Sequence, residues 1–152
     1  MSQDLINIAP TFFGMSLTPK QVWKDYGKAL LIIAGSDGEV SDPELEWLTI
    51  NLAQSLGVEE DIIAFWEEYD FEEEELYDVF SNVDSKSVAS FKKLLIYDAI
   101  RMSYADDDYA DDERERVSEA AGILNVTKDT VLAIEALVEH ERVTDKLRAI
   151  IL

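Results

Sequence analysis

The segment Asp37-Gly38-Glu39-Val40-Ser41-Asp42-Pro43-Glu44 has an acidic counterpart 69 positions later, Asp106-Asp107-Asp108-Tyr109-Ala110-Asp111-Asp112-Glu113. Carboxylates occupy the first, third, sixth and eighth places of both segments. Surface acids scattered by chance would not keep this register. The pattern therefore predicts two equivalent loops, each offering hard oxygen ligands, on an otherwise helical chain.

The similarity extends into the sequence on both sides of the loops. An apolar run precedes the first loop at residues 29–34, and residues 98–103 hold the same position before the second. After the loops, residues 56–62 parallel residues 124–130 with a slip of one residue. Gly57 and Asn125 are of the two types that best tolerate the left-handed conformation that ends a helix. Each half is thus predicted to be helix, acidic loop, helix, tight turn and helix, as in a duplicated domain.

Apolar periodicity predicts an all-α fold, a single compact bundle of about seven or eight helices built from these two halves. Thr18, Pro19 and Gln21 form a helix start with a capping box, and Asp42-Pro43 opens the second helix by the same logic. No run alternates with a period of two, so no strand is expected. The expected helices cover residues 18–34, 42–56, 59–68, 72–80, 87–104, 111–124 and 127–141, with an eighth closing the chain to Ile150.

A chain of 152 residues is long enough to bury one substantial core. We expect an N-terminal arm over residues 1–17, whose apolar side chains pack onto the body. The helical domain follows over residues 18–152, with halves at about 18–81 and 87–152. The arm carries Asp4 and no basic region, so it does not resemble a signal peptide.

The charge balance restricts the classes of partner. There are 13 basic and 33 acidic residues, which gives a net charge of −20. Such a charge repels nucleic acid and anionic membrane surfaces and attracts metal cations or a basic protein. No stretch approaches 18 uncharged apolar residues, so membrane insertion is not expected. The oligomeric state stays open.

The chain contains no cysteine. This excludes disulfides, thiolate zinc sites and cysteine nucleophiles, and it is compatible with the cytoplasmic location that we expect. The single histidine, His140, cannot build the paired motif of a di-iron bundle and is expected at the surface.

Helix electrostatics separate the acids of the two loops into two groups. Four of them lie at helix starts, where the backbone amides favour negative charge: Asp42, Glu44, Asp111 and Glu113. Asp37 and Asp106 instead follow helix ends, where a negative charge is disfavoured by roughly 0.3–1 kcal/mol. No lysine or arginine stands within the loops, so a bound cation would relieve this repulsion.

A set of ligands that contains carboxylates but no cysteine and no nearby histidine favours calcium, magnesium or manganese as the divalent metal ion. The loops are not EF-hands, because their sixth places hold Asp42 and Asp111 where that motif needs glycine. The spacing alone is equally compatible with ordinary solvated turns.

The spacing of Asp37-Gly38 and Glu44 after an apolar helix, repeated at Asp106 and Glu113, resembles the TerB-like family, named for tellurite resistance. The resemblance covers roughly residues 18–140. It implies a compact helical protein that acts as a non-enzymatic, metal-binding and partner-binding module in a bacterial stress response. The ligand positions that it implies are Asp37, Glu39, Glu44, Asp106, Asp108 and Glu113. The family pattern has glycine where this chain has Asp107.

Two other functions fit the sequence. The acidic segment from Glu67 to Asp78, with interleaved aromatic residues, could dock a basic protein without any metal, although charge runs usually face water. Paired carboxylates could also serve a metal-dependent hydrolase, for which the sequence offers no evident substrate cleft. Chelator response separates metal binding from metal-free docking, and turnover would identify a hydrolase.

Overall fold

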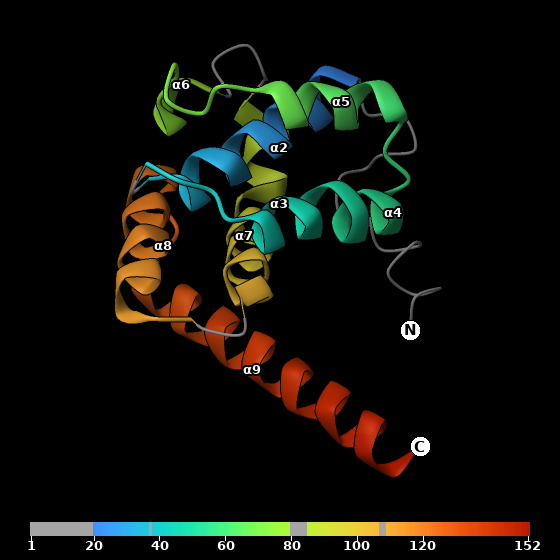
Figure 1. The fold of residues 1–152 in the computed structure, drawn as a ribbon. Coiled ribbons are helices and arrows are strands. Elements are labelled where there is room, and N and C mark those ends of the chain that lie inside the picture. Colours follow the sequence, from blue (N-terminus) through green and yellow to red (C-terminus); the bar gives the residue numbers. More distant parts are fainter. Residues whose placement is uncertain (1–19, 37, 80–84, 107–108) are drawn as a thin grey trace.

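The computed structural model describes residues 20–36, 38–79, 85–106 and 109–152, and these residues form helices joined by loops, with no strand. The all-α prediction is therefore confirmed. The N-terminal arm and the capping residues Thr18 and Pro19 lie outside the described residues. In chain order the elements are α2 (Lys20–Ala34), α3 (Asp42–Glu46), η1 (Trp47–Leu52), α4 (Ala53–Leu56), α5 (Glu60–Glu68), α6 (Leu76–Val79), α7 (Ser85–Ser103), η2 (Tyr104–Asp106), α8 (Asp111–Leu124) and α9 (Lys128–Ile151) (Figure 1).

Most helix boundaries agree with the sequence patterns, and two differ. The helix expected over residues 72–80 begins later than expected, at Leu76, and its described part runs to Val79. The prediction of two separate helices after residue 127 is wrong, because α9 is one continuous helix of 24 residues. Residues 137–146 contain no glycine or proline, so nothing in the sequence interrupts the helix there.

The helix after the first acidic loop begins with a capping box. The Ser41 hydroxyl accepts a hydrogen bond from the Glu44 backbone N–H at 3.2 Å, and Glu44 Oε1 accepts one from the Ser41 N–H at 3.0 Å. Two otherwise unpaired amides are thereby satisfied. The N-cap is Ser41, and Asp42 is the first helical residue.

A π-helical segment interrupts this same helix. The six residues of η1 lie between α3 and α4, and the backbone continues through them without a break. A π-turn accommodates an extra residue in an α-helix and is frequent at functional sites. The first residue of η1, Trp47, contacts Arg101 of α7.

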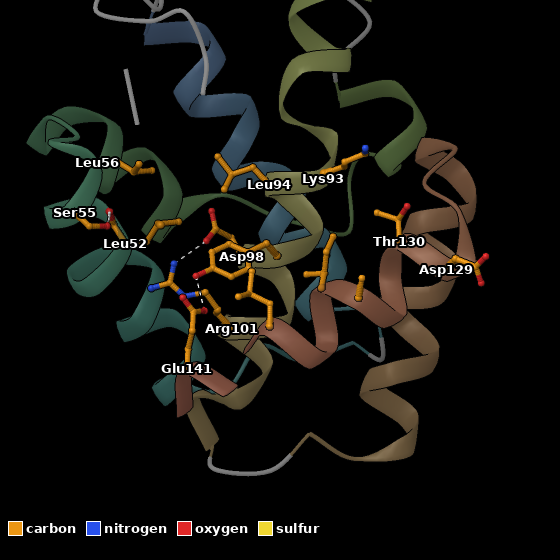
Figure 2. Close-up of a pocket in the computed structure, with 14 residues that line it drawn as sticks. Leu52, Ser55, Leu56, Lys93, Leu94, Asp98, Arg101, Asp129, Thr130 and Glu141 are labelled. Carbon is orange, nitrogen blue, oxygen red and sulfur yellow. Dashed lines mark hydrogen bonds and ion pairs between the residues drawn. The ribbon is translucent and has the colours of Figure 1, made fainter. Parts of the chain in front are cut away.

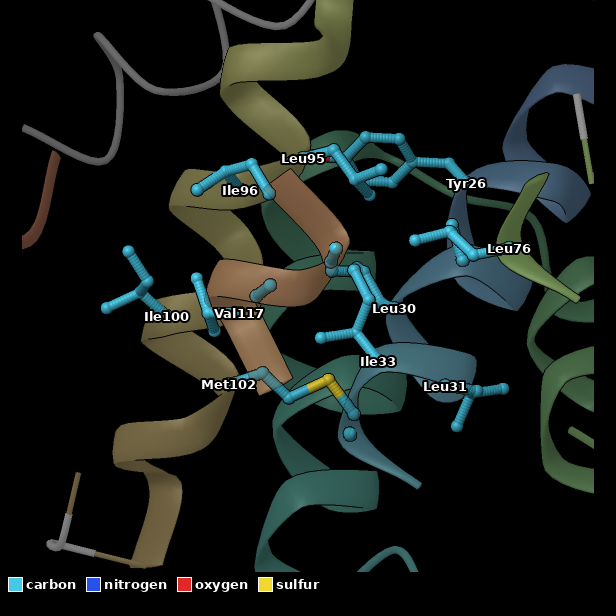
Figure 3. Close-up of a cluster of buried hydrophobic side chains, with 14 of the residues drawn as sticks. Tyr26, Leu30, Leu31, Ile33, Leu76, Leu95, Ile96, Ile100, Met102 and Val117 are labelled. Atoms are coloured by element: carbon cyan, nitrogen blue, oxygen red, sulfur yellow. The ribbon is translucent and has the colours of Figure 1, made fainter. Parts of the chain in front are cut away.

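The core forms where α2 crosses α7 and α8. Tyr26, Leu30 and Ile33 of α2 are buried, as are Leu95 of α7 and Val117 of α8 (Figure 3). Helix α5 then packs on α2, and α9 packs on α7. Burial of such side chains stabilises the fold by about 1.5–3 kcal/mol each. No helix in the described ranges combines the length and the apolar character needed to cross a membrane.

Candidate functional site

The six acids expected as metal ligands are only partly described by the structure. Asp37 and Asp108 lie outside the described residues, and Asp106 is described only as the last backbone position of η2. Glu39 is exposed, whereas Glu44 is buried. Within the described residues, no group of three or more acids and histidines is close enough to hold a metal ion.

The two described glutamates at helix starts have defined positions. Glu44 uses one carboxylate oxygen in the capping box, so its orientation is fixed by the first turn of α3. Glu113 lies in the first turn of α8 with its Oε2 atom buried. Both carboxylates therefore stand where backbone amides and the helix dipole favour negative charge.

Helix ends from the two halves meet near the acidic loops. Helix α3, which follows the first loop, contacts η2, which precedes the second. Arg116 of α8 donates a hydrogen bond from Nη1 to the Ala34 carbonyl, at 2.6 Å, at the end of α2. The loops themselves contain no basic residue, yet the fold supplies a guanidinium to this helix end from a residue 82 positions away. This positive charge favourably opposes the negative end of the α2 helix dipole.

A buried carboxylate, Asp98, lies on α7 in the centre of the molecule. The Tyr26 hydroxyl donates a hydrogen bond to Asp98 Oδ2, and Arg101 Nη1 donates to Oδ1 at 3.1 Å. Burial raises the pKa of Asp98 to about 6, and the charge of Arg101 and the hydrogen bond from Tyr26 limit that rise. Burial, followed by the charge of Asp98, raises the pKa of Tyr26.

Arg101 is held between two aromatic rings. Its guanidinium carbon lies 5.3 Å from the centre of the Trp47 ring and 5.0 Å from that of Tyr97. These are cation–π distances. The π-helical segment η1 supplies Trp47, and the Tyr97 hydroxyl donates a hydrogen bond to Glu141 of α9 at 2.7 Å. Arg101 thus links α7 to η1, and Tyr97 links α7 to α9.

A groove of about 640 Å³ opens above this network. One wall comes from η1 and α4, the floor from α7, and the other wall from α9 (Figure 2). The surface that lines the groove is mostly apolar and includes Leu52, Leu56 and Leu94, and Asp98 and Arg101 are also among the lining residues. Grooves of this size with a mostly apolar surface are typical binding sites. Sequence patterns did not predict the groove, because its walls come from three segments far apart in the chain.

The acidic segment Glu67–Asp78 is mostly solvent-exposed. Exposed carboxylates follow one another at Glu67, Glu68, Asp70, Glu72, Glu73, Glu75 and Asp78. Glu74 differs, because its carboxylate accepts hydrogen bonds from Lys28 at 2.9 Å and Tyr69 at 3.0 Å. The hydrogen bond from Lys28 is the main reason that the pKa of Glu74 is lowered. His140 is exposed on α9, as expected.

Comparison with known proteins gives two matches and one negative result. Residues 28–136 match the family described as tellurite resistance protein TerB. The fold is similar to the crystal structure of a tellurite resistance protein from Nostoc punctiforme, with a TM-score of 0.81 and 25% sequence identity. That alignment covers 95% of this chain and 89% of the other. No curated protein matches the chain.

Proposed function

This chain belongs to the tellurite resistance TerB family, and we propose that it is a non-enzymatic cytoplasmic module that binds a divalent metal ion and a protein partner in a tellurite or stress response. The proposed ligands are three acids of each loop, Asp37, Glu39 and Glu44 in the first and Asp106, Asp108 and Glu113 in the second. Calcium, magnesium and manganese are the favoured ions, because all six groups are hard oxygen donors.

The contact between α3 and η2 is the observation that carries the metal-binding proposal. Through this contact, α3, which follows the first loop, lies beside η2, which precedes the second loop. Two carboxylate-rich loops held this close repel each other in a chain with a net charge of −20. A divalent ion shared between them, or one ion in each, would remove that repulsion.

Because of Arg116, a bound cation should stabilise the end of α2 less than the end of α7. Its hydrogen bond to Ala34 already offsets negative charge at the end of α2. The corresponding basic residue near the end of α7 is Arg101, which is engaged with Asp98. We therefore expect the second loop, next to Asp106, to depend more strongly on a bound cation than the first.

The test is thermal unfolding of chelator-treated protein with calcium, magnesium, manganese or zinc added back. An ion that binds only the folded state stabilises it by about 2.7 kcal/mol at a hundredfold excess over its dissociation constant. For a chain of this length that corresponds to a rise in Tm of roughly 5–10 °C. We expect a selective rise that Asp37→Asn and Asp106→Asn each reduce.

Asp112→Asn is the matched control for these variants. Asp112 is exposed in the first turn of α8, belongs to the same acidic segment as the ligands of the second loop, and is not itself a proposed ligand. Its replacement removes one charge from the same region and should leave the metal-dependent rise intact. The absence of a rise with any ion, or an equal loss in all three variants, would refute the ligand assignment.

A metal-free acidic docking surface is the second candidate function. Its support is the run of exposed carboxylates from Glu67 to Asp78. It predicts that a lysine-rich peptide binds with an affinity that falls with salt and does not respond to chelator. Neutralising Glu67, Glu68, Glu72 and Glu73 to glutamine should weaken this binding more than neutralising four exposed acids of α8 and α9. Equal weakening by both sets would indicate attraction to net charge alone.

A further inference from the structure

The groove above Asp98 has a filled counterpart in the other half of the molecule. Helix α5 packs on α2 as α9 packs on α7, and the short helix α6 lies against both α2 and α8. The side chains of Leu76 and Val79 on α6 are buried there. In the corresponding place above α7, between α4 and α9, the groove is open.

The difference follows from how the chain continues along α5 and along α9. Helix α5 ends at Glu68, and Tyr69 adopts an extended conformation that lets the chain return as α6. Helix α9 does not turn at the corresponding point but continues to Ile151, away from the body (Figure 1). Because α9 is itself one wall of the groove, its straight distal part cannot fold back into the groove of its own copy.

The distal part of α9, residues 143–151, carries an apolar face that is largely exposed to solvent. Leu147 and Ile150 are 50% and 80% exposed, and Val143 and Ile151 are also exposed. Leu147 and Ile150 are three residues apart, as are Leu76 and Val79 of α6. An exposed helix gains most of its stability by packing such a face against a partner.

Charge favours a second copy of this chain as that partner. Residues 143–151 contain Lys146 and Arg148 against the single acid Asp145, whereas the whole chain carries −20. The groove is lined on the α9 side by Asp129 and Glu141, whereas its basic lining residues, Lys93 and Arg101, belong to α7. A basic helix end with an apolar face is thus complementary to an apolar groove with acids along its α9 wall.

We propose that residues 143–151 of one copy occupy the groove of a second copy, with Leu147 and Ile150 in the place that Leu76 and Val79 hold in the first half. The exchange is reciprocal, since each copy offers both this groove and the helix end that fits it, as in a two-fold symmetric dimer. Each groove is then completed by side chains of the partner copy. This inference is independent of metal binding.

Sedimentation and light scattering across a concentration series provide the first test. The parent chain should form a dimer, and Leu147→Asp and Ile150→Asp should each raise the dimer dissociation constant at least about tenfold, as expected for loss of one buried aliphatic side chain. Ile123→Asp is the matched control, because Ile123 is an exposed aliphatic residue of α8, outside the groove. Circular dichroism should show that all three variants stay folded, since the replaced side chains are exposed.

Cross-linking identifies the occupant of the groove. The chain has no cysteine, so single cysteines can be introduced without interference. A mixture of Ser55→Cys and Ile150→Cys proteins should form a mixed disulfide dimer, because Ser55 lines the groove. A mixture of Ser55→Cys and Ile123→Cys should not.

Three results would overturn the proposal. The first is a monomer at all concentrations together with no mixed disulfide. The second is an intramolecular disulfide in a Ser55→Cys, Phe12→Cys double variant of a monomeric chain, which would assign the groove to the N-terminal segment. The third is a dimer that Leu147→Asp and Ile150→Asp leave as tight as the parent.

Discussion

Gly57 and Asn125 end corresponding helices in the same left-handed conformation, with φ and ψ of 68° and 36° for Gly57 and 59° and 37° for Asn125. The backbone hydrogen bonds next to Gly57 and Asn125 match as well. The Val58 amide donates to the Ala53 carbonyl at 2.9 Å, and the Val126 amide donates to the Ala121 carbonyl at 2.8 Å. Both are the six-residue bond of a Schellman motif.

Substitution at these two turns should reveal the shared geometry. Gly57→Ala and Asn125→Ala should each lower the free energy of unfolding by about 1–2 kcal/mol, because alanine is strained in the left-handed region. Nothing lies within 4 Å of a Cβ placed on Gly57, so the cost is one of backbone conformation alone. Urea unfolding measures it.

Gly122→Ala is the control for the turn variants. Gly122 lies within α8, and a Cβ placed on it would also meet nothing within 4 Å. Alanine should therefore raise the free energy of unfolding by about 0.5–1 kcal/mol, because it is the better helix former. Destabilisation by all three substitutions would show that packing, rather than the sign of φ, governs these positions.

Substitution of Gly27 by alanine should lower the stability of the fold, whereas substitution of Gly122 should raise it, although both residues lie in helices. A Cβ on Gly27 would lie 2.0 Å from atoms of the buried Trp66 indole ring. Overpacking of a core typically costs about 1–3 kcal/mol, so Gly27→Ala should lower the midpoint of urea unfolding despite the better helix propensity of alanine. A midpoint equal to or above that of the parent would mean that Trp66 can move aside.

Local signals in the sequence account for most of the fold. Gly57 and Asn125 mark helix ends by their own conformational preferences, and the helices that they end occur where expected. The N-cap expected at Asp42 differs by one residue, because Ser41 is the N-cap. The one-residue slip between the halves also has a structural counterpart, because the helix from Asp42 to Leu56 is one residue longer than α8 and contains the π-helical η1. A slip in sequence register cannot by itself reveal where a helix widens.

Long-range pairs account for the features that the sequence did not predict. Arg116 and Ala34 are 82 positions apart, and Tyr26 and Asp98 are 72 apart. Periodicity identifies which face of each helix is buried but not which face of another helix it meets. The groove could not be predicted for the same reason. The break expected in α9 near His140 is wrong because no glycine or proline there stops the helix.

Arg116→Met tests whether the guanidinium at the end of α2 contributes to stability. Loss of a charged hydrogen bond to the Ala34 carbonyl should lower the free energy of unfolding by about 1–2 kcal/mol, while methionine retains the apolar stem. Arg148→Met is the comparison, since its ion pair with Asp145 is exposed and is expected to contribute less than about 0.5 kcal/mol. Equal effects in urea unfolding would contradict a special role for Arg116.

The pH dependence of stability should report on Asp98. Its pKa is raised from the ordinary value of 3.8 to about 6 in the folded chain, mainly by burial. The folded state therefore holds this proton more tightly than the unfolded state. The stability that this proton on Asp98 contributes is fully present at pH values below the pKa of Asp98 in the unfolded chain. It is lost as the pH rises through the pKa of Asp98 in the folded chain.

The free energy of unfolding of the parent, minus that of Asp98→Asn, should thus fall between about pH 4 and pH 7, by about 3 kcal/mol for a shift of this size. Subtracting the variant removes the contributions of the other acids, which the two proteins share. Arg101→Met should move the fall to higher pH, because the charge of Arg101 lowers the pKa of Asp98. A difference that stays constant across this range would show that Asp98 is ionised at its ordinary pKa despite its burial.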